Sequence, residues 1–146
     1  MLSNSSRYAI RAILYLAGRD KSKGSIGIRE ISSALGLPAP YMSKILQQLA
    51  KNKMLNSVKG PNGGFSMHRK PESITLYDVV KIIDGDAVFR NCLIHDGSCG
   101  DVKRSKKVCT VHEEYSVIRK EINTLFRNTT IAELAGRASD TENIFI

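Results

Sequence analysis

The stretch IREISSALGLPAPYMSKILQQLAKNKMLNSVKGPNGGFSMHRK, residues 28–70, decides the fold of this chain. Its first half carries apolar residues at steps of three and four, the spacing of amphipathic helices. This spacing predicts one helix that starts near Ile28 and ends at Gly36, because glycine commonly follows the last turn of a helix. A second helix follows after a few residues, and Pro38 and Pro40 suit its first turn, whose N–H groups need no partner within the helix. Two helices so closely joined have the spacing of a helix–turn–helix.

The second helix is predicted to have an apolar inner face and a polar, basic outer face. The inner stripe consists of Tyr41, Met42, Ile45, Leu46 and Leu49. The outer face consists of Ser43, Lys44, Gln47, Gln48 and Lys51. In a helix–turn–helix that reads DNA, the second helix enters the major groove. An ordinary helical hairpin with a solvated face would show the same spacing, so the spacing alone leaves both interpretations open.

A β-hairpin is predicted immediately after the second helix. Two short runs, residues 55–59 and 65–68, flank the turn sequence GPNGG at residues 60–64. Proline sets φ for a turn, whereas asparagine and glycine tolerate positive φ. A hairpin in this position is a wing with Lys59 at its tip, and the glycines keep that tip slim enough to lie against a sugar–phosphate backbone. The helix–turn–helix followed by a wing indicates a DNA-binding domain more strongly than either feature alone.

The charge distribution indicates a polyanionic partner. The chain has a formal net charge of +8, and no acidic residue lies between Glu30 and Glu72. That interval carries the basic residues Lys44, Lys51, Lys53, Lys59, Arg69 and Lys70. A basic block on its own is often only a solvated surface, but here it coincides with the helix–turn–helix and the wing. We therefore expect a double-stranded DNA operator as the partner.

The predicted DNA-binding residues fall into two groups. The residues expected to face base edges in the major groove are Ser43, Lys44, Gln47 and Gln48. The residues expected to contact phosphates are Lys51, Lys59 and Lys70. Phosphate contacts make affinity fall steeply with salt. Tyr41 and Asn62 complete the predicted set, and His68 is expected to be a phosphate contact or a strand residue.

Helical patterns also precede and follow this stretch. Residues 6–18 are almost continuously apolar or small and predict a helix buried on most sides. Residues 75–78, TLYD, resemble a capping box that opens a helix through about Ile83. Residues 86–108 are polar and predict a long loop. A short last helix is expected to start at TIAE, residues 130–133.

A long helix is predicted from a capping box at TVHE, residues 110–113, to about Arg127. Its apolar positions alternate in steps of four and three, as in a coiled-coil seam: Val111, Tyr115, Ile118, Ile122 and Leu125. Such a seam either packs on its own domain or forms a dimer interface. Its place after a long loop in a short chain favours the dimer.

The amino-terminal sequence and the composition argue against several other classes of protein. The first apolar run is interrupted by Arg11 and lacks the basic leader and cleavage site of a signal peptide. No window approaches the ~18 apolar residues of a membrane span, so we expect a cytoplasmic protein with no membrane partner. No phosphate loop, paired carboxylates or nucleophile-plus-base arrangement stands out, so an enzyme is not expected.

The cysteines of the chain are confined to one region: Cys92, Cys99 and Cys109, with His112 three residues after the last. Cytoplasmic thiols stay reduced, so the spacing C-x6-C-x9-C-x2-H favours metal binding or redox sensing over a structural disulfide. Thiolates select iron–sulfur clusters, zinc or copper(I). Three alternatives stay open: His112 as an ordinary first-turn residue, His95 as a ligand in its place, and cysteines that are redox-active without a metal.

Three segments resemble the Rrf-type winged-helix regulators, the bacterial family that includes IscR, NsrR and CymR. They are SRYAIRAILYLA at 6–17, residues 28–65, and CTVHEEYSVIRKEI at 109–122, and the resemblance runs from about residue 1 to 136. It implies a homodimer built on the long C-terminal helix, with two winged helices reading a near-palindromic operator. It also implies that Cys92, Cys99 and Cys109 hold a 2Fe–2S or 4Fe–4S cluster, which purification can remove, with His112 matching a fourth ligand. The interval between Cys99 and Cys109 is longer than is usual in the family.

Together these patterns predict a mainly helical protein with a small β-hairpin wing. Residues 1–84 are expected to form a winged helix–turn–helix domain, and residues 85–109 a metal or cluster loop. Residues 110–137 are expected to form a dimerisation helix and a short terminal helix, and residues 138–146 a tail. The predicted function is that of a homodimeric transcriptional repressor gated by an iron–sulfur cluster. Two rivals stay open: the same regulator sensing through zinc, thiol oxidation or a small-molecule effector, and a winged-helix protein-interaction module.

Overall fold

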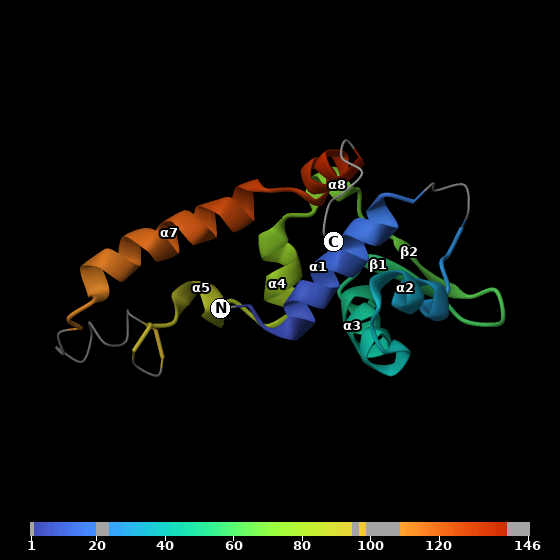
Figure 1. The fold of residues 1–146 in the computed structure, drawn as a ribbon, viewed down its shortest axis with the longest axis horizontal. Coiled ribbons are helices and arrows are strands. Elements are labelled where there is room, and N and C mark those ends of the chain that lie inside the picture. Colours follow the sequence, from blue (N-terminus) through green and yellow to red (C-terminus); the bar gives the residue numbers. More distant parts are fainter. Residues whose placement is uncertain (1, 20–23, 95–96, 99–108, 140–146) are drawn as a thin grey trace.

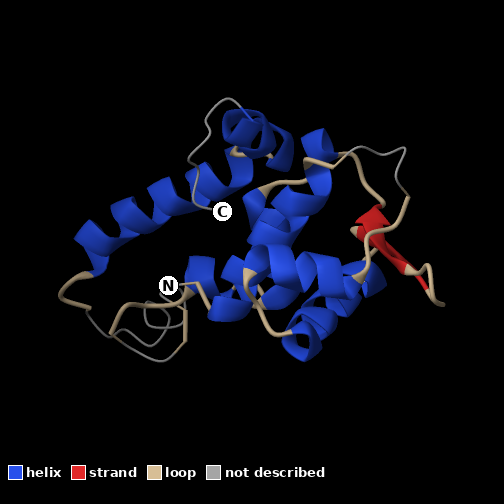
Figure 2. Cartoon of the chain, turned by 45° about the vertical axis from the view of Figure 1, so that its right-hand side comes forward, coloured by secondary structure: helices blue, strands red, loops and turns tan. Residues whose placement is uncertain are grey.

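The computed structural model describes residues 2–19, 24–94, 97–98 and 109–139 of the 146-residue chain. The described part of the chain is mostly helical and contains one two-stranded antiparallel sheet. A long C-terminal helix extends away from the helical body, and the hairpin lies at the opposite end (Figure 1). The strands stand at the edge of the body in a second view as well (Figure 2). The predicted class, mainly helical with a hairpin wing, is confirmed.

Helix α1 (Asn4–Ala17) supplies the centre of the core. The hydroxyl of Ser3 caps this helix by accepting a hydrogen bond from the backbone N–H of Ser6, at 3.1 Å. Ala9, Ala12 and Ile13 are fully buried. The buried helix predicted for residues 6–18 is therefore confirmed.

Helices α2 (Ile28–Leu35) and α3 (Ala39–Lys51) form the helix–turn–helix. Gly36 ends α2 with a φ of 64°, a left-handed conformation that glycine adopts without the steric cost of a Cβ. Pro38 and Pro40 lie at the start of α3, as expected. The buried side chains of α3 are Met42, Ile45, Leu46 and Leu49. Tyr41, predicted as part of the same inner stripe, is exposed, so that detail is wrong.

Strands β1 (Leu55–Val58) and β2 (Gly64–Met67) form the wing. On the other side of β2, the backbones of Ile26 and Phe65 exchange two hydrogen bonds of 2.9 Å each. A Cβ on Gly64 would lie 2.2 Å from the carbonyl oxygen of Ile26, so only glycine permits this close approach of two backbones. The predicted hairpin is confirmed, and the end of β2 next to its turn is tied to the segment that precedes α2.

Helix α4 (Leu76–Ile83) follows a short 3-10 helix, η2 (Pro71–Ser73), and starts at the predicted capping box. The Thr75 hydroxyl accepts from the Asp78 N–H at 3.2 Å, and the Asp78 carboxylate accepts from the Thr75 N–H at 3.0 Å. Val79 and Val80 are fully buried. The helix packs against both α1 and α3, so it lies directly behind the helix–turn–helix.

The prediction of an unbroken loop over residues 86–108 is wrong at its start. Residues Ala87–Arg90 form the short helix α5. Its Phe89 is buried, with its ring centroid 4.9 Å from that of Tyr77 and 5.4 Å from that of Phe126. A four-residue helix is too short to show a helical period in its sequence. We infer that the packing of Phe89 against two other helices stabilises it.

Helix α7 (His112–Asn128) and helix α8 (Ile131–Ser139) complete the described fold. The capping box predicted at residues 110–113 is wrong: α7 starts at His112, and its N-cap is Val111, which has no side-chain acceptor. Thr110 lies one residue too early to cap the helix. The expected start of the last helix is confirmed, because Thr130 and Glu133 exchange hydrogen bonds of 2.9 and 3.2 Å.

The junction between α7 and α8 is fixed on the core. The Leu76 N–H donates to the Thr129 carbonyl at 3.0 Å, and the Ile131 N–H donates to the Ile74 carbonyl at 2.8 Å. Ile131 is fully buried. The other end of α7 extends away from the body (Figure 1), and none of its side chains is buried. No helix in the described part of the chain is long and apolar enough to cross a membrane.

Candidate nucleic-acid interface and cysteine site

Most of the residues predicted to bind DNA lie on the outer face of α3 and on the wing. Lys44, Gln47 and Lys51 are exposed on α3, and Lys59 and Asn62 are exposed at the hairpin turn. We call these five residues the recognition surface. Ser43 is half-buried beside them, and its hydroxyl accepts a hydrogen bond from the Gln47 amide at 3.2 Å. Lys70, just before η2, is exposed as well.

Two predicted DNA-binding residues already have protein partners. The side-chain amide of Gln48 donates to the carbonyl oxygen of Ile82 at 2.7 Å, which links α3 to the last turn of α4. The Tyr41 hydroxyl shares a hydrogen bond of 2.6 Å with Ser5, and its ring packs edge-on against Tyr8. Both side chains therefore position α3 on its neighbours. Sequence spacing contains no signal for either contact, since the partners are 34 and 36 residues away.

Two residues of the wing were not singled out as a pair by sequence reasoning. His68 and Asn56 are exposed and opposed near the base of the hairpin, and His68 Nδ1 lies 2.8 Å from Asn56 Oδ1. The Asn56 amide also donates to the Met67 carbonyl at 3.2 Å. His68 follows the last residue of β2, and these contacts hold it against β1.

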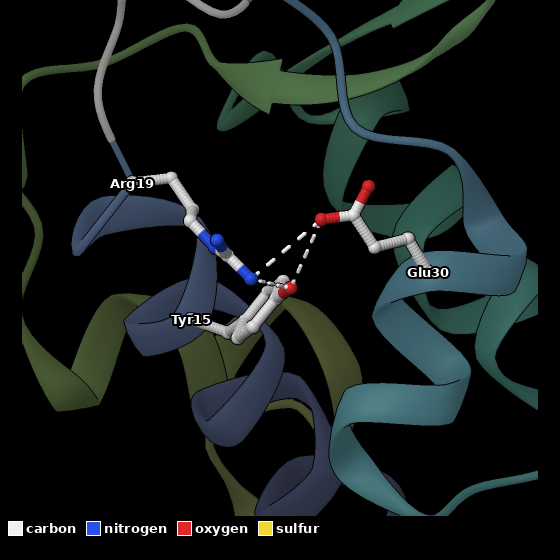
Figure 3. Close-up of polar contacts among 3 residues, drawn as sticks. All are labelled: Tyr15, Arg19 and Glu30. Carbon is white, nitrogen blue, oxygen red and sulfur yellow. Dashed lines mark hydrogen bonds and ion pairs between the residues drawn. The ribbon is translucent and has the colours of Figure 1, made fainter.

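The acidic residue that borders the basic interval, Glu30, is paired within the protein. Its carboxylate lies 3.6 Å from the Arg19 guanidinium and accepts a hydrogen bond of 3.3 Å from the Tyr15 hydroxyl. Arg19 also donates to Tyr15 and stacks over its ring, 4.5 Å from the centroid (Figure 3). The pair is exposed to solvent, so its contribution to stability is small. Its position bridges α1 and α2.

Cys92 and Cys109 are brought together in space. Cys92 follows α5, Cys109 precedes α7, and their Sγ atoms lie 3.9 Å apart. Both residues are half-buried. The backbone N–H of Cys92 donates to the Gly97 carbonyl at 2.9 Å, and the Cys109 carbonyl accepts from the His112 N–H at 3.2 Å. Each cysteine is therefore held by its own short backbone contact.

The segment before Cys92 is attached to both α4 and α7. Arg119 on α7 donates to the carbonyl oxygens of Arg90 and Asn91, at 3.4 Å each. Phe89 packs between Tyr77 of α4 and Phe126 of α7. The guanidinium of Arg127 lies over the Tyr77 ring, 3.7 Å from its centroid. The contacts of this segment therefore couple the position of Cys92 to the positions of α4 and α7.

The two sulfurs fit a soft metal. In a tetrahedral site with metal–sulfur bonds of about 2.3 Å, two sulfur ligands lie about 3.8 Å apart. The observed separation of 3.9 Å matches two ligands of one metal atom. Of the other predicted ligands, His112 is half-buried in the first turn of α7, whereas Cys99 and His95 lie outside the described residues. Within the described residues alone, no three metal-ligating side chains are grouped.

Known proteins resemble the chain along nearly its whole length. The Rrf2 family model, described as an iron-dependent transcriptional regulator, matches residues 2–137. A protein of Aquifex aeolicus (strain VF5), provisionally named an HTH-type transcriptional regulator, is 31% identical over 135 residues, 92% of this chain and 90% of that protein. The HTH-type transcriptional regulator IscR of Sodalis glossinidius (strain morsitans) is 28% identical over 133 residues, 91% of this chain and 77% of that protein.

Two solved structures share the fold. CymR, the global cysteine regulator of B. subtilis, superposes with a TM-score of 0.76 at 20% identity, over 94% of this chain and 97% of that chain. IscR of T. potens superposes with a TM-score of 0.71 at 23% identity, over 100% of this chain and 93% of that chain. At these identities the structures support the winged-helix fold alone. The match of the family model shows the relationship itself: the chain belongs to the Rrf2 family, whose members are transcriptional regulators and not enzymes.

Proposed function

We propose that this protein is a homodimeric repressor that binds a near-palindromic operator and whose DNA affinity is controlled by an iron–sulfur cluster. Cys92, Cys99 and Cys109 would hold the cluster, with His112 as the fourth ligand. The single observation that carries the sensing part is the approach of the Cys92 and Cys109 sulfurs to 3.9 Å from the ends of two different helices.

Support for DNA binding comes from the recognition surface. It presents three lysines and two amides, all exposed, and no acidic residue occurs in the chain from residue 31 to residue 71. Amide side chains read base edges in the major groove, and lysines neutralise phosphates. The backbone hydrogen bonds between Ile26 and Phe65 attach β2 to the preceding segment close to the turn that carries Lys59. The surface therefore has the charge and the side-chain types that suit a DNA duplex.

Support for a homodimer comes from α7. Four of its apolar side chains are exposed, Val117, Ile118, Ile122 and Leu125, with between 41% and 58% of their surface accessible. Exposed apolar side chains repeated along one helix mark an interaction site. Three of the four belong to the predicted seam. A second copy of α7 would cover these three and set two winged helices at a fixed separation, as a palindromic operator requires.

The route from the cysteine site to α3 supports control of DNA affinity. Phe89, three residues before Cys92, packs on Tyr77 of α4, and the last turn of α4 holds α3 through Gln48. A bound cluster would supply a centre that oxidants can destroy. Its ligands would fix the relative positions of the α5 end and the α7 start. Loss of the cluster would remove this constraint, so that α5 could shift. Because α5 packs on α4 and α4 bonds to α3, the position of α3 would then change as well.

The cluster is tested by anaerobic purification with visible absorption spectroscopy and assays of iron and acid-labile sulfide. We expect a coloured protein whose colour and iron are lost in the Cys92→Ala and Cys109→Ala variants. The Ser116→Ala variant, which changes a side chain in the early part of α7 without removing a thiol, is the matched control. A colourless wild-type protein with no iron after anaerobic reconstitution would reject the cluster.

DNA binding is tested by selecting bound fragments from the genome and measuring their affinity by fluorescence anisotropy. Lys44→Glu and Lys59→Glu should each weaken binding about tenfold or more, because each replaces a phosphate-attracting charge by a repelling one. Lys120→Glu, the same change on exposed α7, should have little effect. Equal affinities for all four proteins would instead favour a protein-interaction module. Reduced transcription from the selected fragment in vitro would identify the protein as a repressor.

A further inference from the structure

We propose that Cys92 and Cys109 form an intramolecular disulfide when the metal-free protein meets a hydroperoxide. This modification needs only these two thiols, so it does not depend on the proposed cluster. Where the cluster is present, the same two sulfurs would be occupied as its ligands. The disulfide would therefore mark the protein that has lost its cluster, and it would withhold two of the three thiols needed to rebuild one.

The geometry of the pair favours this bond. A disulfide needs a sulfur–sulfur distance of about 2.0 Å, so the two Sγ atoms must approach by about 1.9 Å from their present 3.9 Å. Side-chain rotation with a small backbone shift can provide this. Both cysteines are half-buried, so their sulfurs are not sealed in the core.

The surrounding contacts keep the pair together without a metal. The Arg119 guanidinium binds the carbonyls of Arg90 and Asn91, which places the end of α5 against α7. The carbonyl of Gly97 accepts from the Cys92 N–H, and Asn91 and Ser98 form an isolated bridge. Cys109 is held by the first turn of α7 through the His112 N–H. All of these contacts are made by backbone groups or Arg119, so oxidation of the thiols leaves them intact.

The chemistry balances with one hydroperoxide per disulfide. One thiolate attacks the peroxide, so that a sulfur–oxygen bond forms, the oxygen–oxygen bond breaks, and an alcohol leaves after protonation. The second thiol then attacks the resulting sulfenic acid, so that the sulfur–sulfur bond forms, the sulfur–oxygen bond breaks, and water leaves with the proton of the thiol. The two sulfurs together lose two electrons, and the peroxide gains them.

The sequence allows an unambiguous test by peptide mapping. Cleavage after Lys and Arg and before Asp separates the three cysteines into peptides 91–95, 96–100 and 108–119. The metal-free wild-type protein is treated anaerobically with one equivalent of hydrogen peroxide, alkylated and digested. We expect peptide 91–95 linked to peptide 108–119, alkylated Cys99, and a fall in titratable thiols from the three of the sequence to one. Reduction should restore all three thiols.

Variants define the pairing. Cys99→Ser should still form the link, whereas Cys92→Ser and Cys109→Ser should not. Circular dichroism of each variant establishes that it is folded. A link through Cys99 in the wild-type protein, a disulfide between two chains on a non-reducing gel, or three alkylated cysteines after treatment would each overturn the proposal.

The two proposals fail in different ways. A protein that forms the Cys92–Cys109 link but never binds iron supports the disulfide and rejects the cluster. A protein that binds a cluster and never forms the link after its removal rejects the disulfide and supports the cluster.

Discussion

The winged-helix part of the chain and the long helix α7 differ in what stabilises them. Helices α1 to α4 and the wing enclose fully buried side chains such as Ile13, Leu46 and Val79. Helix α7 has 17 residues and no buried side chain. The first region is therefore stabilised by its own core, whereas the second leaves apolar surface that a partner would have to cover.

The largest expected effect comes from the core. Leu46→Ala removes a fully buried side chain from α3 and should lower the free energy of unfolding by about 2–5 kcal/mol, measured by urea denaturation. Val117→Ala changes a valine on α7 with 58% of its surface exposed, and its effect should stay within about 0.5 kcal/mol. Similar losses in both variants would mean that the two regions do not differ as described.

The attachment of the wing is tested by Gly64→Ala. The new Cβ would lie 2.2 Å from the Ile26 carbonyl oxygen, so the two backbones must separate. We expect a loss of about 2–3 kcal/mol in unfolding free energy, together with weaker DNA binding. Gly136→Ala places the same methyl group in open space on α8 and should raise stability by about 0.5–1 kcal/mol, because alanine favours a helix. If both substitutions changed the unfolding free energy in the same direction, the close approach of the Gly64 and Ile26 backbones would be contradicted.

The exposed stripe of α7 is tested by Ile118→Glu. Burial of a charge in a dimer seam should raise the dimer dissociation constant about 30-fold or more, a change of about 2 kcal/mol, as measured by analytical ultracentrifugation. Thr124→Glu, also exposed on α7 but outside the seam, should leave the constant nearly unchanged. A wild-type protein that is monomeric at micromolar concentration would contradict the idea that a second copy of α7 covers this stripe.

Gln47 and Gln48, neighbours on α3, extend the comparison to a single helix. Gln48→Ala breaks the bond to the Ile82 carbonyl and should cost about 1 kcal/mol of stability, with the order of preferred bases unchanged. Gln47→Ala should instead leave stability within about 0.5 kcal/mol and relax the preference at one base pair. Urea denaturation and competition with operator variants measure the two effects. A base-specific loss in Gln48→Ala would restore its predicted role as a base-reading residue.

The smallest effect is expected at Asp84, which joins the end of α4 to the start of α1. Burial raises the pKa of Asp84, but the Ser3 hydroxyl at 2.6 Å, the nearby Ser6 hydroxyl and the Ser3 backbone N–H at 3.1 Å act in the opposite direction, and the pKa is lowered overall. Because the folded pKa is below the unfolded value, this group stabilises the protein above the unfolded pKa of about 3.9, and the stabilisation is lost as pH falls through the folded pKa.

Asp84→Asn should therefore flatten the fall in stability below about pH 4, by no more than about 1 kcal/mol since the carboxylate is mostly in water. Urea denaturation between pH 2.5 and pH 7 measures the change. Ser3→Ala should reproduce part of it, and the double variant should add little to either single variant. If the free energy of unfolding of Asp84→Asn falls below pH 4 as steeply as that of the wild-type protein, the contact of Asp84 with Ser3 does not contribute to the pH dependence.

Elements with a local sequence signal were predicted well. The turn between α2 and α3, the hairpin, the capping box at Thr75 and the start of the last helix at Thr130 depend on residues within a few positions of one another. The misses have non-local causes. Helix α5 depends on the packing of Phe89 against two helices, and the exposed Tyr41 bonds to Ser5, 36 residues away. The capping box at residues 110–113 had the right residue types one position out of register with the helix start.

The sequence by itself was enough to predict the winged helix. The spacing of apolar residues, the turn residues and the run without acidic side chains are all local properties of the sequence. It also placed the cysteines between two helices. Only the tertiary structure decided that Cys92 and Cys109 meet, 17 residues apart, since that contact depends on the docking of α5 through Phe89 and Arg119. It likewise decided that Gln48 holds α3 on α4. Contacts between distant segments arise from packing, which no local period encodes.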